Sequence, residues 1–222
     1  MSVKIITVGE DILTANEEKA RANQNRLDKH GILTINIMSS PGAGKTSLLL
    51  GTISRMKDKC RIAVIEGDVA SSVDAEKINE QGVAVVQINT AGGCHLDANM
   101  VESAMNSLPL ENIDLLFIEN VGNLICPNAF LLGEHKRVMI SSMPEGDDKP
   151  LKYPAMFADT DVVLLNKIDL KPHLDFNVDN FKKSVIGLNP DVIIFSISCK
   201  TGEGLEAWLS WLESTIKDRK DR

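Results

Sequence analysis

Residues 39–49, SSPGAGKTSLL, decide the fold, because they fit the phosphate-loop pattern G-x-x-x-x-G-K-S/T at every position except the first. Ser39 stands at the first glycine. The two later glycines, Gly42 and Gly44, occupy the positions where the chain approaches a phosphate more closely than a Cβ permits. Ser39 lies where a strand enters the loop, farther from the phosphates, and needs only an ordinary negative φ. The missing glycine therefore leaves the prediction of a phosphate loop intact.

The residues on either side of this loop fit the same prediction. An apolar strand pattern, ILTINIM, precedes it, and an apolar helix pattern, SLLLGTISRM, follows it from about Gly44. The N-terminus of such a helix attracts an anion. Lys45 would supply a charge to the β- and γ-phosphates, and Thr46 would offer a hydroxyl to Mg²⁺. The predicted phosphate-binding residues are Pro41, Gly42, Ala43, Gly44, Lys45, Thr46 and Ser47.

Six further apolar runs of strand length follow the loop. They cover residues 61–66, 83–89, 114–120, 137–142, 161–166 and 191–198. Because the runs are continuously apolar, we expect strands that are buried on both faces, as in a parallel sheet covered by helices. The sequence predicts an α/β fold of the P-loop NTPase type, with three αβα layers and a mostly parallel sheet of about seven strands.

Asn166-Lys167-Ile168-Asp169 follows one of these runs, about 120 residues after the phosphate loop. A carboxylate at Asp169 can accept hydrogen bonds from the ring N–H and the amine of guanine, a pairing that adenine cannot offer. The stem of Lys167 can lie over the flat base. The next run ends in a loop similar to the S-A-K loop that closes over the guanine oxygen in GTPases. The sequence predicts GTP rather than ATP, bound through Asn166, Lys167, Asp169, Ser198, Cys199 and Lys200.

Acidic residues at other strand ends are candidates for magnesium binding and catalysis. Glu119 and Gly122 stand where many GTPases have D-x-x-G, so that the carboxylate can reach Mg²⁺ and the Gly122 amide can sense the γ-phosphate. Asp68 and Asp74 are further candidates. We predict magnesium binding by Thr46, Asp68 and Glu119, and a catalytic set of Lys45, Thr46, Asp68 and Glu119. No arginine or glutamine stands out as a catalytic group, so we expect slow intrinsic hydrolysis.

Two helices are expected at the ends of the chain. The segment from Thr14 to His30 opens with the capping box Thr14-Ala-Asn-Glu17 and closes at Gly31, and its sparse apolar residues predict a surface position. A stripe at helical spacing predicts a packed helix over residues 204–217. We divide the chain into an N-terminal extension and helix, 1–31, and a P-loop GTPase domain, 32–222, within one globular unit.

Composition narrows the class of protein. The chain has 222 residues, 43% of them hydrophobic, enough for a sizeable core. Its net charge of -7 argues against nucleic-acid and anionic-membrane partners. No apolar run reaches the roughly 18 residues of a membrane span, and the start MSVKIITVGED lacks the features of a signal peptide. Four scattered cysteines do not form a secreted disulfide framework. We expect a cytoplasmic protein with reduced thiols.

Cysteine and histidine residues follow two successive strand patterns. Cys94 and His95 come after the run 83–89, and Cys126 comes after the run 114–120. Thiolate and imidazole ligands suit Zn²⁺, Ni²⁺ or Cu rather than Mg²⁺ or Ca²⁺. Three ligands suit a site that releases its ion or is completed by a symmetry mate. Taken alone, the spacing leaves open that the two cysteines are buried fillers and His95 is a turn residue.

Six segments, taken together, resemble the HypB family, the nickel-insertion GTPases of hydrogenase maturation. They are SSPGAGKTSLL, EGDVASSVDAEKI, TAGGCHLDANMV, ENVGNLICP, NKID and SCKTGEG. The resemblance covers nearly the whole chain and is most specific over TAGGCHLDA and ENVGNLICP. It implies a nickel or zinc site formed by Cys94, His95 and Cys126 near the switch segments. It also implies a homodimer promoted by GTP, with the metal between the subunits, and a lysine, Lys149 or Lys152, that reaches the partner's nucleotide. The implied protein partners are a hydrogenase maturation protein and the precursor of a hydrogenase large subunit.

The chain departs from some family members. It has no cysteine before Cys60 and only four histidines, so the N-terminal nickel motif and the histidine-rich tract of some members are missing. The related urease GTPase has Cys-Pro-His, whereas Cys94 here is joined directly to His95, which weighs against urease as the client. The alternatives are a maturation GTPase for urease or for a cobalamin-dependent mutase, a metal-binding protein without turnover, and a small-molecule kinase.

Overall fold

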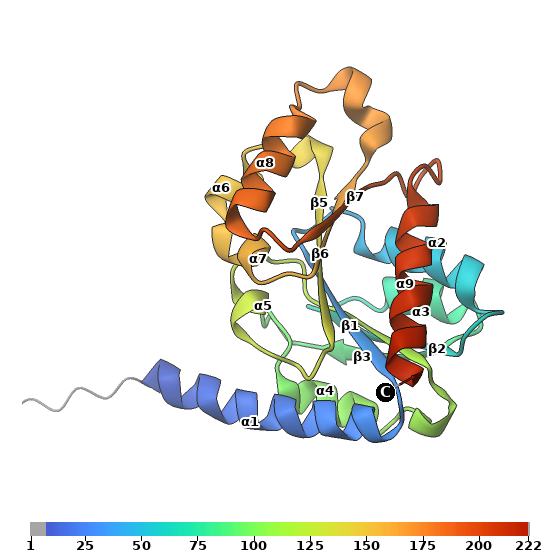
Figure 1. The fold of residues 1–222 in the computed structure, drawn as a ribbon. Coiled ribbons are helices and arrows are strands. Elements are labelled where there is room, and N and C mark those ends of the chain that lie inside the picture. The colour runs from blue at the N-terminus through green and yellow to red at the C-terminus, as the bar shows by residue number, and fades with distance from the viewer. Residues whose placement is uncertain (1–7, 222) are drawn as a thin grey trace, which may run out of the picture.

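The structure, a computed structural model, describes residues 8–221. Seven strands form one parallel sheet in the order β3-β2-β4-β1-β5-β6-β7 (Figure 1). The strands are β1 Leu33–Ser39, β2 Ile62–Asp68, β3 Ala84–Asn89, β4 Leu115–Glu119, β5 Lys136–Ser142, β6 Val162–Asn166 and β7 Ile193–Ser196. Each strand coincides with one of the predicted apolar runs, so the predicted parallel sheet is confirmed.

Helices cover both faces of the sheet, which gives the predicted three layers (Figure 1). One face packs against α2, α3 and α9. The other packs against α1 and α4 at one end and against α7 and α8 at the other. The helices are α1 Val8–Lys29, α2 Lys45–Met56, α3 Val73–Asn79, α4 Ala98–Met105, α5 Cys126–Ala129, α6 Lys149–Lys152, α7 Pro154–Ala158, α8 Val178–Leu188 and α9 Leu205–Lys220. Single 3₁₀ turns lie at Leu110–Asn112 and Met143–Glu145, and a longer 3₁₀ segment at Ile168–His173.

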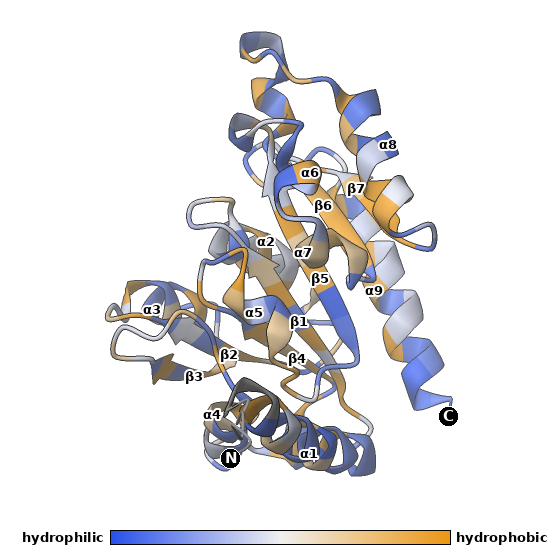
Figure 2. Ribbon diagram, turned by 90° about the vertical axis from the view of Figure 1, so that its left-hand side faces the viewer, coloured by the Kyte–Doolittle hydropathy of each residue, from blue (hydrophilic) through white to orange (hydrophobic). Residues whose placement is uncertain are grey.

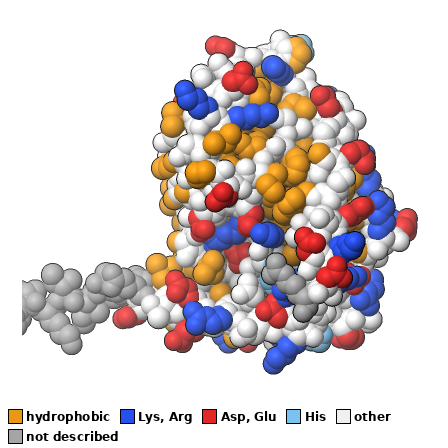
Figure 3. Space-filling view, viewed as in Figure 1, with side chains coloured by type: hydrophobic (Ala, Val, Ile, Leu, Met, Phe, Trp, Pro, Cys, Tyr) orange, Lys and Arg blue, Asp and Glu red, His pale blue; other side chains and the backbone are white. Residues whose placement is uncertain are grey.

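The apolar pattern of the chain follows these layers. Figure 2 shows apolar strands inside the molecule and polar outer surfaces on helices such as α1 and α9. The space-filling view adds apolar side chains gathered where α8, β7 and α9 lie in Figure 1 (Figure 3). Within residues 8–221, no helix combines the length and the apolar character that a membrane span requires.

The last helix packs as its apolar stripe predicted. All of its stripe residues are buried: Leu205, Trp208, Leu209, Leu212 and Ile216. The indole N–H of Trp208 donates to Thr52 Oγ1 at 3.0 Å, which satisfies the one polar atom of this buried ring and fixes α9 against α2.

The first helix begins earlier than predicted. It starts at Val8, so Thr14 lies inside the helix and the predicted capping box does not form its start. Residues 8–13, which include Glu10 and Asp11, are compatible with a helix. A capping pattern inside a longer helix has the same local sequence as a true N-terminal cap. The predicted end is confirmed, because α1 ends at Lys29 and Gly31 has a φ of +65°. Residues 1–7 of the proposed extension lie outside the described residues.

Candidate functional site

The phosphate loop connects β1 to α2 at the carboxyl edge of the sheet, where ligands bind in open α/β folds. Gly42 and Gly44 have φ angles of +74° and +111°, in the region that favours glycine. A Cβ on Gly44 would lie 2.4 Å from Asn166 Nδ2. The Lys45 ammonium donates to Ser39 Oγ at 3.2 Å. Serine at the first glycine position therefore fits the loop and supplies an acceptor to its lysine.

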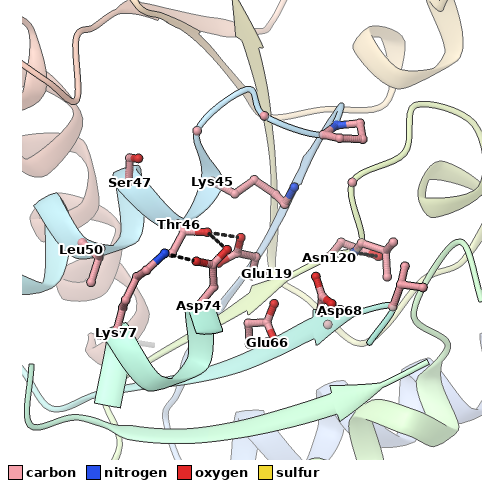
Figure 4. A pocket seen from close by; sticks show the side chains of 17 residues that line it. Lys45, Thr46, Ser47, Leu50, Glu66, Asp68, Asp74, Lys77, Glu119 and Asn120 are labelled. Atoms are coloured by element: carbon pink, nitrogen blue, oxygen red, sulfur yellow. Dashed lines mark hydrogen bonds and ion pairs between the residues drawn. The ribbon is translucent and has the colours of Figure 1, made fainter. Parts of the chain in front are cut away.

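A cavity of about 470 Å³ opens beside this loop (Figure 4). Its walls are the phosphate loop, the start of α2, the end of β2 with the residue after it, α3, and the end of β4 with the residues that follow it. Four carboxylates face it, and Lys45 reaches toward them from the loop in Figure 4. These carboxylates belong to Glu66, Asp68, Asp74 and Glu119. Two ammonium groups, of Lys45 and Lys77, face these four carboxylates, and Lys77 Nζ pairs with Asp74 at 2.7 Å. The remaining surplus of carboxylates fits a site that binds a cation together with an anionic ligand.

Thr46 lies between two of these carboxylates. Its Oγ1 is 3.0 Å from both Asp74 Oδ2 and Glu119 Oε1, although one hydroxyl can donate to only one of them at a time. The other oxygen of Glu119 is buried and has no hydrogen-bond partner among the described residues. Mg²⁺ prefers oxygen ligands of this kind, and the unpartnered oxygen of Glu119 would be available to bind it. The structure therefore brings the predicted Thr46 and Glu119 together and adds Asp74, while Asp68 lines the same cavity.

Burial shifts the titration of these groups. It lowers the pKa of the Lys45 ammonium, and the neighbouring carboxylates oppose that shift. Burial also raises the pKa of Glu119 to about 7, against the opposing charge of Lys45. The pKa of Glu66 rises to about 8, through burial and the charge of Glu119, its register partner on the neighbouring strand.

Glu66 is a site residue that the sequence analysis missed. Its side chain is 3% exposed, and its Oε2 has no hydrogen-bond partner within the described part of the chain. A carboxylate inside an otherwise apolar strand was the available signal, since a buried charge is costly unless a partner or a ligand compensates it.

The predicted base-binding residues lie directly against the phosphate loop. Asn166 Nδ2 donates to Ala43 O at 2.9 Å, and Asn166 Oδ1 accepts from Cys199 N at 3.2 Å. Lys167 Nζ donates to Gly42 O at 2.7 Å. These bonds join β6 and the loop after β7 to the phosphate loop. Asn166 therefore holds the loop and supports the residues expected to surround the base.

The carboxylate expected to recognise the base is held by the next loop. Ser198 Oγ donates to Asp169 Oδ1 at 2.6 Å, which leaves the second carboxylate oxygen available to a ligand. Burial raises the pKa of the Cys199 thiol to about 11, which fits a neutral filler beside the base rather than a reactive group. Lys200 is exposed at the end of this loop.

Cys94, His95 and Cys126 converge as predicted. Their ligand atoms all lie within 4.8 Å of one another. The two Sγ atoms are 2.9 Å apart, and Cys94 Sγ is 3.5 Å from His95 Nδ1. The His95 ring stacks on Phe130 with centroids 3.9 Å apart, which fixes the orientation of the imidazole. The alternative that the two cysteines are buried fillers is wrong, because Cys94 is exposed and Cys126 is half-buried.

The pKa directions of this cluster favour a neutral imidazole at His95 and a protonated thiol at Cys126. Burial lowers the pKa of His95, although Asp97 opposes the shift. The hydrogen bond with Cys94, followed by burial, raises the pKa of the Cys126 thiol. A soft divalent ion would bind the imidazole directly and displace protons from the thiols.

Residues 119–123 connect the two sites. Glu119 and Gly122 line the cavity, and a Cβ on Gly122 would lie 3.0 Å from Pro41 Cα in the phosphate loop. Asn120 Oδ1 accepts from Leu96 N at 3.2 Å, and Asn123 Nδ2 donates to Cys94 O at 3.2 Å. One short segment thus contacts the phosphate loop and the backbone of the cysteine–histidine cluster. Sequence reasoning identified Glu119 and Gly122 but gave no role to the asparagines.

The two candidate lysines of the implied dimer differ in exposure. Lys149 Nζ lies 3.6 Å from Glu145 Oε1 and is 18% exposed, and Glu145 also accepts a hydrogen bond from Ser40 in the phosphate loop. Lys152 pairs with Asp148 at 2.5 Å and is 61% exposed. Lys149 is therefore part of the loop's own surroundings, whereas Lys152 extends into solvent.

A phosphate loop at the carboxyl edge of a parallel sheet, with carboxylates around its lysine and threonine, defines a P-loop nucleotide-binding protein. The family CobW/HypB/UreG, nucleotide-binding domain, matches residues 33–196. The hydrogenase maturation factor HypB of Rhizobium leguminosarum bv. viciae is 49% identical over 99% of this chain and 73% of its own length. The corresponding protein of Escherichia coli (strain K12) is 46% identical over 95% of this chain and 73% of its own length. The chain belongs to the HypB family of hydrogenase maturation factors, as the resemblance predicted.

Solved structures agree with this assignment. HypB from Helicobacter pylori, crystallised in complex with nickel, superposes with a TM-score of 0.88 at 38% identity and covers 93% of this chain and 97% of that one. FtsY from Mycoplasma mycoides, at 17% identity, 88% and 72% coverage and a TM-score of 0.55, shares the fold alone. The predicted P-loop fold is confirmed by these likenesses.

Proposed function

We propose that this chain is a GTP-hydrolysing metallochaperone that binds nickel at Cys94, His95 and Cys126 and delivers it during hydrogenase maturation. The observation that carries the proposal is the segment 119–123, which contacts the phosphate loop at one end and the backbone of Cys94 and Leu96 at the other. Membership in the HypB family supports the process. A relative solved with nickel supports the metal.

Guanine specificity is assigned to Asp169. Its carboxylate can accept bidentately from the ring N–H and the amine of guanine, because Oδ1, which accepts from Ser198, keeps a second lone pair and Oδ2 lies beside it. Adenine presents no matching pair of donors. Lys167 would lie over the base from its position against the phosphate loop.

Hydrolysis is assigned to the groups around the cavity. Lys45 neutralises charge on the β- and γ-phosphates, and Mg²⁺, which supplies the remaining positive charge when bound, would be held by Thr46 and by the carboxylates Asp68, Asp74 and Glu119. The residues that line the cavity include no arginine and no glutamine. Because such a group is what accelerates GTPases strongly, the intrinsic turnover should be slow.

Coupling between the two sites is assigned to residues 119–123. A γ-phosphate and Mg²⁺ would engage Glu119 and the Gly122 amide, and the same segment holds Cys94 and Leu96 through Asn123 and Asn120. The nucleotide state would therefore change the geometry of the three metal ligands. Coupling of this kind is reciprocal, so nickel must alter nucleotide affinity by the same factor.

A GTP-promoted homodimer completes the proposal. Three ligands leave the metal site open, and a second copy would add its own three. Ile125, next to the ligand Cys126, is 70% exposed, and Val69 and Val73 beside the cavity are 43% and 53% exposed, as expected for surfaces that a partner covers. Lys149 or Lys152 would reach the partner's nucleotide. The further partners would be a hydrogenase maturation protein and the large-subunit precursor.

Elution size tests the dimer and the metal site together. The chain is run with and without a GTP analogue and Ni²⁺, and the metal in each peak is measured. A dimer-sized peak that needs the analogue and carries nickel supports the proposal. A chain that elutes as a monomer without nickel under all four conditions would overturn it. A phosphate-release assay separates this function from that of a metal-binding protein without turnover.

A further inference from the structure

Two asparagines of α1 are buried on one face of the helix. Asn16 and Asn23 lie two helical turns apart, and their exposed fractions are 5% and 2%. An amide in such a place costs free energy unless its polar atoms are bonded, so its partners reveal why it is not an apolar residue.

Each of these amides joins the same two segments of the chain. Asn16 Oδ1 accepts from Ala98 N at 2.9 Å, and its Nδ2 donates to Leu131 O at 2.8 Å. Asn23 Nδ2 donates one hydrogen to Ala98 O at 2.8 Å and the other to Leu132 O at 3.1 Å. The two side chains thus bridge the start of α4 to residues 131–132. An aliphatic side chain of similar size could fill the same space but could not make this bridge.

The two bridged segments carry the metal-ligand cluster. Ala98 begins α4, three residues after His95. Leu131 follows Phe130, the residue after α5, whose ring stacks on the His95 ring at 3.9 Å. The first residue of α5 is Cys126. The bridge therefore joins the segment that follows His95 to the segment that carries Phe130 and Cys126.

Other contacts of α1 dock the helix without joining the two segments. Lys19 Nζ pairs with Glu102 of α4 at 3.0 Å, and Gln24 Nε2 donates to Glu134 O at 3.1 Å. Close packing keeps the bridge tight at Gly133, where a Cβ would lie 2.7 Å from Asn23 Cβ. The helix is thus pressed onto the seam between the two segments.

We propose that α1 is a clamp for the cysteine–histidine cluster, in which Asn16 and Asn23 are positioning residues that hold its two ligand-bearing segments together. The inference rests on the proposed metal binding and extends it to a helix outside the nucleotide-binding core. A group bonded directly to a metal ligand commonly contributes about 10–100-fold to metal affinity. The two asparagines act one step farther from the metal, through the backbone of the ligand-bearing segments, so each should contribute less.

The clamp is tested by Asn16→Ala and by Asn23→Ala, with Leu27→Ala as the control. Leu27 is a fully buried residue of the same helix that packs in the core, so its loss destabilises α1 without breaking the bridge. The first readout is nickel affinity, followed through the thiolate-to-nickel absorption band. We expect affinity to fall by severalfold, up to about 10-fold, in the asparagine variants and to stay unchanged in the control.

The second readout needs no metal. Dibromobimane cross-links two neighbouring thiols, and its reaction with Cys94 and Cys126 is followed at pH 8 by fluorescence and peptide mass. Burial raises the pKa of the Cys60 and Cys199 thiols to about 11, which keeps both slow to react. We expect cross-linking to slow severalfold in the asparagine variants.

The outcomes separate this inference from the proposed function. Cross-linking and nickel binding equal to those of the wild type in both asparagine variants would overturn the clamp. Equal losses in Leu27→Ala would overturn it too, because they would assign the effect to helix stability. If the wild type shows no thiolate-to-nickel absorption band, the proposed metal binding is overturned. The clamp is then still tested by comparing the cross-linking rates of the wild type and the asparagine variants. Asn16→Ala, at the less buried of the two positions, keeps the test available if Asn23→Ala does not fold.

Discussion

At the scale of single residues, Lys45 holds the nucleotide site together electrostatically. Its ammonium lies among the carboxylates of Glu66, Asp68, Asp74 and Glu119, and burial lowers its pKa while their charges oppose the shift. The raised pKa values of Glu66 and Glu119, about 8 and about 7, indicate that these carboxyls can take up protons when positive charge is scarce. We therefore expect the fold to survive the loss of the ammonium.

Replacing this lysine gives the first prediction. Lys45→Met keeps the apolar stem and removes the charge on the phosphates, so hydrolysis should fall by about 10²–10³-fold. Circular dichroism and the unfolding midpoint should stay close to those of the wild type. The measurement is phosphate release at saturating GTP and Mg²⁺. A variant that keeps wild-type turnover would remove Lys45 from the catalytic set.

Most of the individual site residues could be predicted from the sequence, because each stands at a strand end in a recognisable pattern. The predicted positions after the strands contain Lys45, Thr46 and Glu119 in the cavity, and Cys94, His95 and Cys126 in the cluster. The buried carboxylate of Glu66 had a signal in its apolar strand, but its register partner Glu119 was not predictable. Asn120 and Asn123 could not be assigned, because their roles depend on which loop backbone lies beside them. Such pairings exist only once the sheet order is known.

At the scale of elements, the segment after β4 contacts both sites. Gly122 packs against the backbone of Pro41, where an added Cβ would lie 3.0 Å from both its Cα and its N. A methyl group there would push the segment away from the phosphate loop. The hydrogen bonds of Asn120 and Asn123 to the cysteine loop lie outside that contact.

The second prediction follows from this packing. Gly122→Ala should weaken GTP binding and reduce hydrolysis, while nickel binding without nucleotide should persist. The control is Gly187→Ala in the exposed part of α8, where nothing lies within 4 Å of the new Cβ. That control should stabilise the chain by about 0.5–1 kcal/mol and leave hydrolysis unchanged. Wild-type hydrolysis in Gly122→Ala would show that this contact is dispensable.

The junction of α1 with the sheet gives a pH-dependent prediction. His135 Nδ1 accepts from Thr34 N at 2.9 Å, and Nε2 lies 2.8 Å from Asp28 Oδ1 near the end of α1. Burial lowers the pKa of His135 from 6.5, although Asp28 opposes the shift. The folded chain therefore binds fewer protons at this site than the unfolded chain. The stabilisation is complete above pH 6.5 and is lost as pH falls toward the lower pKa of the folded state.

Urea unfolding of the wild type and of His135→Gln, followed from about pH 7 to about pH 5, measures this contribution. The raised pKa values of Glu66 and Glu119 act in the opposite direction, since folding makes those groups bind protons more readily. They are common to both proteins, so the difference between the two curves isolates His135. We expect the advantage of the wild type to shrink as pH falls. An advantage that does not change with pH would contradict this role.

The elements themselves were largely predictable. All seven strands and the last helix follow from apolar runs and spacing that local sequence carries. The start of α1 could not be predicted, because Thr14 begins a capping pattern that lies inside a longer helix. The short helices α5, α6 and α7 have four or five residues each and give no periodic pattern to detect.

At the scale of the whole molecule, the fold gathers two kinds of chemistry on one edge of a sheet. Hard oxygen ligands surround the phosphate loop, soft thiol and imidazole ligands follow β3 and β4, and residues 119–123 join them. The parallel topology accounts for this arrangement, because every loop after a strand emerges at the same edge. The class of each site was predictable from residue types, whereas the physical connection between them required the three-dimensional structure.

The most direct test of the account is the affinity for nickel measured in three nucleotide states: with a GTP analogue and Mg²⁺, with GDP and Mg²⁺, and without nucleotide. Cys94→Ser serves as the control that removes a ligand while sparing the nucleotide site. The account predicts that nickel affinity differs between the states by about 5–150-fold, and that nickel shifts the affinity for the analogue by the same factor. Identical nickel affinity in all three states would contradict it.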